Sequence, residues 1–458
     1  MSEGALHAPG RAPGLAARRS AAQGGAARFL LPLFLISLVI PTYFFLGTMR
    51  LSPYRLLLVV MFIPLLVQWL GGKAGRIRAP DILILLFCLW EALALARVAG
   101  IGRSYQFSGI FLVETFGGYL LARVLIRDFE TFRFFVKCFA LVVLILGPFA
   151  MYEAVSKHAI LLDIFRPIMP THTMVTGLEE RWGMRRAQGP FEHPILYGVF
   201  CASAFALSVY VLGHGRKGPG RLVWPAGSAF ATFASLSAGA WLAVVLQIGI
   251  MIWDHALRRM RRRWWLFLGL VIAAYVAVDI LSNRTPVAVF ISYMTFNAHN
   301  SFIRLAIFEH GMNNVWARPL FGMGPWGDWF RPYWLPPSVD NFWLLMAMRH
   351  GIPAFLFLAG AWAVVLSGLA RMKSAIPAIL AARKGLLIVL AGLAFSLSTV
   401  HLWNATYVFL CALLGSGMWM VEWRDPPGTG READAPRPPA RRAVLGESRT
   451  PQGRRTVL

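Results

Sequence analysis

The sequence predicts an all-α membrane protein: a polytopic bundle of about twelve transmembrane helices with one large extracytoplasmic loop. Composition is the first observation behind this prediction. Of the 458 residues, 57% are hydrophobic and only 14% are charged, whereas soluble domains carry roughly 25% charged residues. The second observation is that apolar runs of about 20 residues, the length of a bilayer-spanning helix, recur along the chain. The sequence does not show the alternating ten-residue segments of a membrane β-barrel.

Twelve apolar segments are long enough to be interpreted as spans, with boundaries good to a few residues. Two neighbouring pairs are weaker, because each could instead form a re-entrant hairpin: the segments on either side of residue 238 and those around His401. The spans are predicted at residues 29–47, 54–71, 81–99, 107–126, 131–151, 191–213, 222–238, 239–257, 264–282, 341–369, 386–401 and 402–421.

The two ends of the chain differ in composition from its apolar centre. Residues 1–28 are basic and rich in Gly, Ala and Pro, and residues 422–458 are rich in Pro and Arg. We therefore expect two disordered basic cytoplasmic tails around one transmembrane domain at residues 29–421. The run at 29–47 is too long for the core of a signal peptide and has no convincing cleavage site, so it is predicted to be the first span.

The distribution of Lys and Arg orients the bundle. A net charge of +24 would suggest nucleic-acid binding in a soluble protein. Here the basic residues gather in alternate loops, most strongly in the run RRMRRR at Arg258–Arg263, which follows the positive-inside rule. We therefore expect a multi-pass protein with both termini cytoplasmic and no nucleic-acid partner.

This orientation leaves two long segments outside, roughly residues 152–190 and 283–340. Loops of this length usually carry function. Apolar and aromatic residues recur through the first half of the second loop, which predicts a helix lying on or near the outer interface. Its glycine-rich stretch FGMGPWG is expected to form a tight turn rather than a nucleotide-binding motif, because no strand precedes it.

Arginine is unusual in outer loops, because the positive-inside rule acts against it. Guanidinium groups hold phosphate oxygens through paired hydrogen bonds, so a cluster near span entrances predicts a site for an anionic ligand. The alternative is that these arginines reach lipid headgroups or pair with Glu179, Glu180 or Glu309. The outer arginines are Arg181, Arg185, Arg186, Arg304, Arg318 and Arg331.

Other polar residues lie at the mouths of spans or within them. In the stretch GPFEHP, Glu192 and His193 are candidates for substrate binding or catalysis, with helix capping or a surface role as the alternative. Within the spans, Glu91, Glu114 and Arg349 are costly in lipid, so a buried pair between Arg349 and one of the glutamates is expected. A proton or ion path is the alternative. The four cysteines have neither disulfide nor zinc-ligand spacing, and no metal site is expected.

These motifs occur in the order seen in the O-antigen ligase/polymerase superfamily, which the chain resembles over about residues 180–365. The resemblance is carried by RRAQGPFEHPILYG, by SLSAGAWLA, by an arginine upstream of VWARPLFGMGPWG, and by DNFWLLMAMRHGIPAF. Three positions depart from the family pattern. Ala238 replaces the arginine of a Ser-Arg-Gly turn, Asp340 replaces the histidine of a His-Asn pair, and Arg349 replaces an acidic residue.

The resemblance implies a membrane glycosyltransferase of GT-C-like architecture in the bacterial inner membrane. Members take a glycan from undecaprenyl diphosphate on the outer side and pass it to an O-antigen or exopolysaccharide chain, as polymerases, or to lipid A-core, as ligases. No cofactor is implied, because arginines balance the diphosphate charge; by position these would be Arg304 and either Arg185 or Arg186. Polymerase is preferred here, since nothing in the sequence identifies a lipid A-core site.

Asp340 stands where the family places a histidine that engages the acceptor hydroxyl. An aspartate can orient that hydroxyl by accepting its hydrogen bond, so Asp340 and Arg304 are the catalytic candidates. Asn341 and His401 join the substrate-binding candidates, and His401, beside Asn404, could act as the base instead. Helix N-capping is the alternative role for Asp340. The alternative function is a flippase for lipid-linked oligosaccharide, although the sequence shows no internal repeat.

Overall fold

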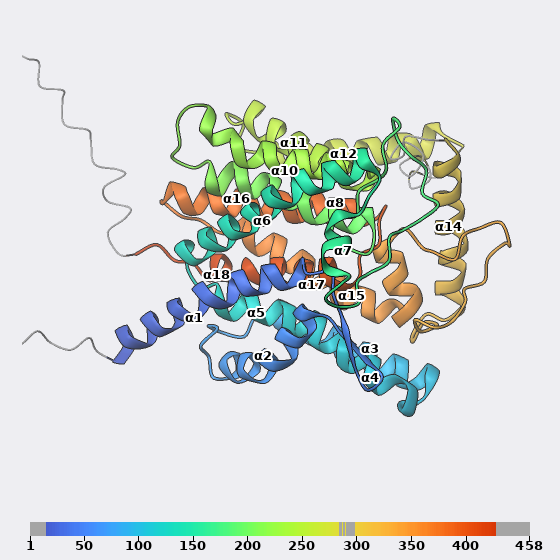
Figure 1. Ribbon diagram of the computed structural model, residues 1–458. Helices are drawn as coiled ribbons and strands as arrows, with labels where there is room; N and C mark the ends of the chain where they lie inside the picture. The colour runs from blue at the N-terminus through green and yellow to red at the C-terminus, as the bar shows by residue number, and fades with distance from the viewer. Residues whose placement is uncertain (1–14, 284–285, 287–288, 290–297, 427–458) are drawn as a thin grey trace, which may run out of the picture.

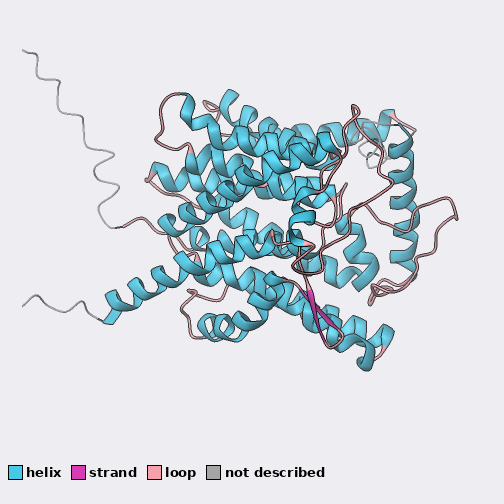
Figure 2. Ribbon diagram, viewed as in Figure 1, coloured by secondary structure: helices cyan, strands magenta, loops and turns pink. Residues whose placement is uncertain are grey.

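The computed structural model describes residues 15–283, 286, 289 and 298–426. Most of this part of the chain is helix, with one short antiparallel hairpin between β1 (Phe44–Leu46) and β2 (Met49–Leu51) (Figure 2). Within these residues, ten helices are long and apolar enough to cross a membrane. The prediction of an all-α polytopic membrane protein is confirmed.

Each of the predicted spans contains a helix, and several spans are built from consecutive helical pieces that run into one another. The helical elements in chain order are α1 (Leu15–Leu38), α2 (Pro53–Leu70), α3 (Ala79–Ala99), α4 (Ile101–Leu112), η1 (Val113–Gly117), α5 (Gly118–Leu125), α6 (Phe129–Ser156), α7 (Ile160–Phe165), α8 (Pro194–Ala202), α9 (Phe205–Leu207), η2 (Ser208–Leu212), η3 (Pro219–Leu222), α10 (Val223–Ala234), α11 (Ala238–Ala256), α12 (Arg263–Leu281), α14 (Ala298–Ala317), α15 (Phe342–Arg371), α16 (Pro377–Ser396), α17 (Asn404–Ser416) and α18 (Met418–Val421).

Two helices are shorter than the spans predicted for them. Helix α1 ends at Leu38 rather than near residue 47, because Pro41 cannot continue a helix and the chain then enters the β hairpin. It begins at Leu15, inside the segment expected to be a disordered tail. Helix α10 has only 12 residues, or about 18 Å. The chain turns at Leu236, whose φ is +45°, before α11 begins.

Helix α17 lies at the centre of the bundle, and α12 lies at its edge. With α18, α17 forms a span that is 89% buried within the protein, whereas none of the α12 span is buried. Helix α17 packs against α5, α3 against α15, α6 against α10, and α11 against α16. The spanning helices run side by side, and α14 crosses their ends on one side of the bundle (Figure 1). Helix α14 is the helix predicted in the first half of the second outer loop.

Helix α15 is broken at Gly351, where φ is +84° and ψ is 170°. The loop that follows α14 fills the break, and a Cβ atom at Gly351 would lie 1.9 Å from the carbonyl oxygen of Leu320. The tight turn expected in this loop is present, since Gly322 and Gly324 have φ of +65° and +75°. Backbone hydrogen bonds join the loop to α15: Met323 N–H to Met348 O (2.9 Å), Gly324 N–H to Arg349 O (2.9 Å) and Ile352 N–H to Pro319 O (2.7 Å).

A buried ion network ties together helix ends that adjoin basic loops. Arg123 of α5 is fully buried and pairs with Asp81 of α3 at 3.2 Å. The same guanidinium pairs with Glu422, just after α18, at 2.8 Å. Glu422 also pairs with Arg127 at 3.0 Å. These bonds hold the C-terminal end of the described chain against α3 and α5.

Candidate functional site

Two arginines and one aspartate meet beside the start of α15. Arg186 comes from the loop before α8, Arg304 from α14, and Asp340 from the end of the second outer loop. Burial raises the pKa of Asp340 and lowers the pKa of both arginines, and the opposite charges partly counter these shifts, which shows that the three groups act on one another. The structure thus brings together residues that are more than a hundred positions apart in the sequence.

Both guanidinium groups keep hydrogen-bond donors unused. Arg186 Nε and Arg304 Nη1 are buried and have no hydrogen-bond partner among the described residues. Neither arginine forms an ion pair with Asp340 there, although both charges are close enough to shift its pKa. Burial lowers the pKa of Arg186 to about 10, so it remains charged at neutral pH. Buried cationic donors without partners are costly, and they favour an anionic ligand between the two arginines.

The N-cap of α15 is Asn341 and not Asp340. Asn341 Oδ1 accepts a hydrogen bond from the N–H of Leu344 at 3.0 Å, which is the capping contact. The capping role considered for Asp340 is therefore wrong. Burial raises the pKa of Asp340 above its ordinary value, and the two arginines only partly oppose this shift. The carboxylate of Asp340 is left without a helix-capping role and faces the arginines.

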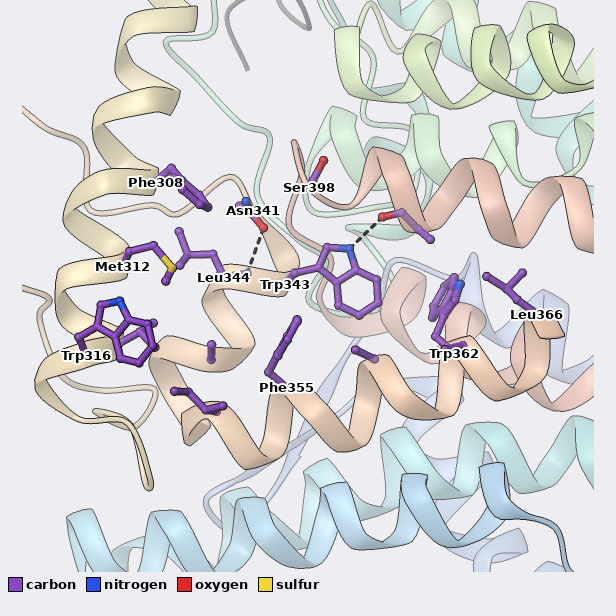
Figure 3. A pocket seen from close by; sticks show the side chains of 16 residues that line it. Phe308, Met312, Trp316, Asn341, Trp343, Leu344, Phe355, Trp362, Leu366 and Ser398 are labelled. Carbon is purple, nitrogen blue, oxygen red and sulfur yellow. Dashed lines mark hydrogen bonds between the residues drawn. The ribbon is translucent and has the colours of Figure 1, made fainter. Parts of the chain in front are cut away.

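The charged cluster adjoins a large apolar cavity. A small cavity is lined by Arg304, Asp340 and Asn341, and it shares Phe308, Asn341 and Ser398 with a cavity of about 680 Å³. Apart from Asn341 and Ser398, side chains of apolar residues line the larger cavity, from α14, α15 and the end of α16 (Figure 3). Figure 3 shows Phe308, Met312 and Trp316 on α14 facing Leu344, Trp343 and Phe355 on α15. Polar and apolar surfaces therefore meet at Asn341.

The neighbouring Arg185 and Arg181 donate hydrogen bonds to backbone carbonyls, although the charge of Arg181 also adds to the lowering of the pKa of Arg186 and Arg304 by burial. Arg185 donates from Nη2 to the carbonyl oxygen of Val175 at 2.8 Å, and its Nε lies 3.9 Å from Glu153 Oε1. Arg181 donates from Nη1 to the carbonyl oxygen of Leu236 at 2.6 Å, in the turn between α10 and α11. Of the two arginines that the sequence left as equal candidates, Arg186 is the one beside Asp340 and Arg304.

Glu192 belongs to a second polar cluster. Its Oε1 accepts a hydrogen bond from Asn404 Nδ2 at 2.8 Å and lies 3.2 Å from His172 Nε2. His172 Nδ1 lies 2.7 Å from an Nη atom of Arg50, and Asn404 Oδ1 accepts a hydrogen bond from Arg55 at 2.9 Å. Glu192 Oε2 is buried without a hydrogen-bond partner in the described part of the chain. Burial raises the pKa of Glu192.

Two histidines lie between the two clusters. His193 caps α8, since its Nδ1 accepts a hydrogen bond from the N–H of Ile195 at 3.1 Å. His401 stacks between Phe342 and Trp403, with ring centroids 6.2 Å and 5.4 Å away. Burial, and then the charge of a nearby arginine, lower the pKa of His193 to about 4 and that of His401 to about 3. Both imidazoles are therefore neutral at neutral pH, and His401 is a weak base.

The buried charges within the spans pair differently from the prediction. Glu114 pairs with Arg55 at 2.6 Å, both carboxylate oxygens of Glu91 lack a hydrogen-bond partner, and Arg349 forms no ion pair among the described residues. The expected pairing of Arg349 with Glu91 or Glu114 is therefore wrong. The physical reason is helix rotation, because η1 turns Glu114 toward the start of α2.

Sequence reasoning missed several residues of this region. A signal for two of them was available, since Arg50 and Arg55 lie at the end of a span that the charge pattern predicts to face outward, where the positive-inside rule disfavours arginine. No comparable signal in the sequence marks the other missed residues, which are either uncharged or isolated from other charged residues along the chain. The missed residues are Arg50, Arg55, Glu153, His172 and Asn404.

Comparison with protein families gives one finding. A family model described as O-Antigen ligase matches residues 222–359. The matched segment includes α14, Arg304, Asp340 and the first half of α15, whereas Arg186 lies before it. Comparison with curated proteins gave no match. Among the described residues, no group of three or more His, Cys, Asp or Glu side chains could hold a metal ion. The resemblance to the O-antigen ligase superfamily is confirmed.

Proposed function

We propose that this member of the O-antigen ligase superfamily is a membrane glycosyltransferase that uses a glycan linked to undecaprenyl diphosphate. One observation carries the proposal: Arg186 and Arg304, each with a buried donor that is unused, lie beside Asp340, and Arg304 adjoins, at Asn341, an apolar cavity of about 680 Å³ between α14 and α15. A ligand suited to both parts has an anionic head and a long apolar tail. A polyprenyl diphosphate has this composition.

In this proposal, Arg186 and Arg304 hold the diphosphate. Guanidinium groups donate paired hydrogen bonds to phosphate oxygens, and a partly buried site strengthens these charge-assisted bonds. The same contacts stabilise the diphosphate as it leaves, because its negative charge increases when the glycosidic C–O bond breaks. The polyprenyl segment next to the diphosphate would lie against Phe308, Trp343 and Phe355, which line the cavity.

Asp340 is then placed to act on the acceptor. Its carboxylate accepts a hydrogen bond from an acceptor hydroxyl, whose oxygen attacks the anomeric carbon of the donor sugar. The new glycosidic bond forms, the bond to the diphosphate breaks, and undecaprenyl diphosphate leaves with the electron pair. The hydroxyl proton passes to the carboxylate of Asp340. The raised pKa of Asp340 suits this late proton acceptance better than that of an exposed aspartate.

The acceptor distinguishes two activities. It is a growing O-antigen or exopolysaccharide chain for a polymerase, and lipid A-core for a ligase. Deleting the gene in the organism that carries it, and then analysing the length and attachment of its surface polysaccharide, separates them. Single repeat units on the surface indicate a lost polymerase, and full-length chains that stay on the lipid carrier indicate a lost ligase. Repeat units trapped on the cytoplasmic leaflet would contradict the proposal and indicate a flippase.

A further inference from the structure

A polar recess of about 870 Å³ lies where the start of α6 meets α1 and α10. These helix ends adjoin basic loops that the charge pattern predicts to face the cytoplasm. One part of the recess is apolar and is formed by Phe134, Leu212 and Trp224. The cationic residues that line it come from three separate parts of the chain and are Arg28, Arg133, Lys137 and Arg216.

These four cationic side chains have no role in holding the fold together. Among the described residues, none of them forms an ion pair or a side-chain hydrogen bond. Some other basic residues at helix ends that adjoin the basic loops are paired. Glu422 binds Arg123 and Arg127, and Asp254 binds Arg263 at 2.8 Å and Lys384 at 2.9 Å. The recess therefore gathers four cations that form no ion pair within the described part of the chain.

Two carboxylates also line the recess, and both have a role in α6. Asp128 is the N-cap of α6 and accepts hydrogen bonds from the N–H of Thr131 at 2.8 Å and from its hydroxyl at 3.1 Å. Glu130 lies in the first turn of α6, where a negative charge stabilises the helix. The four cations outnumber these two carboxylates, so the recess remains positive overall.

We propose that this recess binds the phosphate headgroup of an anionic phospholipid from the inner leaflet. Basic pockets between membrane helices on the cytoplasmic side bind such headgroups. Tryptophan favours the membrane–water interface, so Trp224 and Phe134 suit the junction between headgroup and acyl chains. The inference does not depend on the proposed glycosyltransferase activity, because the recess shares no residue with the arginine site.

The test measures lipid binding to the full-length protein in mild detergent by native mass spectrometry. Cardiolipin and phosphatidylglycerol are titrated against zwitterionic phosphatidylethanolamine, and inorganic pyrophosphate serves as a soluble anion. Two double variants are compared: R133Q with K137Q, and R28Q with R216Q. Each is expected to weaken binding of the anionic lipids about twenty-five-fold, since each of the two cations removed contributes roughly fivefold near anionic headgroups.

A matched control carries R258Q with R261Q, which removes two exposed basic residues outside the recess. This control should bind the anionic lipids as the unmodified protein does. An equal loss in the control would overturn the proposal, because it would show diffuse surface attraction. Equally strong binding of phosphatidylethanolamine or of pyrophosphate would also overturn it. The unfolding temperature without added lipid shows whether each variant is folded. If only one of the two double variants is folded, its lipid binding alone tests the proposal.

Discussion

Arg55 of α2 donates a hydrogen bond from Nε to Glu114 Oε1 at 2.6 Å, and both side chains are mostly buried. The hydroxyl of Tyr54 donates to the same oxygen at 3.0 Å. Arg55 also reaches Asn404 at the start of α17, with Nη2 2.9 Å from its Oδ1. Arg55 therefore balances the charge of Glu114, and these contacts join α2, η1 and the central helix α17.

Glu114→Ala is expected to lower accumulation of the protein in the membrane. It leaves Arg55 as an uncompensated buried charge, which costs roughly 3–5 kcal/mol in soluble proteins. Adding Arg55→Leu should restore much of the loss, because both charges are then absent. Immunoblotting of membranes and the unfolding temperature in detergent measure the effect. Glu179→Ala at an exposed site is the control. A double variant less stable than Glu114→Ala would contradict the pairing.

Arg304→Lys is expected to lower transferase activity at least about tenfold while the protein accumulates normally. Lysine keeps the positive charge but loses the planar fork that binds two phosphate oxygens at once. The measurement is glycan transfer by purified protein from lipid-linked donor isolated from the organism that carries the gene. Arg318→Lys, at an exposed position in the same outer segment, should leave transfer unchanged. Near-full activity of Arg304→Lys would show that Arg304 only anchors α14.

Arg185 and Arg186 are expected to fail in different ways. Arg186→Lys should reduce transfer with little effect on stability, because its guanidinium Nε has no hydrogen-bond partner among the described residues. Arg185→Lys should lower the unfolding temperature, because Arg185 holds Val175 and lies beside Glu153. Transfer assays and thermal unfolding of both variants separate the two effects. The reverse result would move the diphosphate site to Arg185.

Asp340→Asn is expected to reduce transfer about a hundredfold without weakening α15, whose cap is Asn341. Protonation removes the charged acceptor, and burial raises the pKa of Asp340. Activity of the unmodified protein should therefore fall as the pH drops through that raised pKa. In the Asn variant this fall should be missing. A fully active Asp340→Asn protein would exclude the carboxylate from the reaction.

His401 provides the contrasting test for that assignment. His401→Phe keeps a ring between Phe342 and Trp403 but has no basic nitrogen. If Asp340 is the group on the acceptor side, this variant should retain most of its activity. Severe loss, with an unchanged unfolding temperature, would make His401 the base instead.

Membrane orientation is expected to follow the loop charges. A reporter that is active only outside the cytoplasm should work when it is fused near Arg304 and fail when it is fused near Arg262. The physical reason is the basic run at Arg258–Arg263, which holds its loop on the cytoplasmic side. Activity at both fusion points, or the opposite pattern, would remove the basis for an outward arginine site.

The helices were predictable because the hydropathy of each residue can be read directly from the sequence. Arg186, Arg304 and Asp340 were all candidates for one outward site, and their outward orientation remains a prediction. Their roles in catalysis remain predictions. The pairing was not predictable, because it depends on how each helix is rotated: Glu114 of η1 pairs with Arg55 of α2, and Arg349 forms no ion pair with it. The sequence gives no reason to choose between the adjacent Arg185 and Arg186. Only the path of the folded loop shows which of the two lies beside Asp340.

The break in α15 has a consequence for the order of assembly. Segment 342–371 cannot satisfy its own backbone around Gly351, because the N–H of Ile352 bonds to the carbonyl oxygen of Pro319. Unsatisfied backbone groups are very costly in hydrocarbon. Segment 342–371 can therefore insert stably in the bilayer only after residues 319–324 have supplied hydrogen-bond partners for its backbone around Gly351. If residues 319–324 are exported, as the loop charges predict, chain export and insertion of α15 are coupled, and completing α15 also fixes the loop that follows α14.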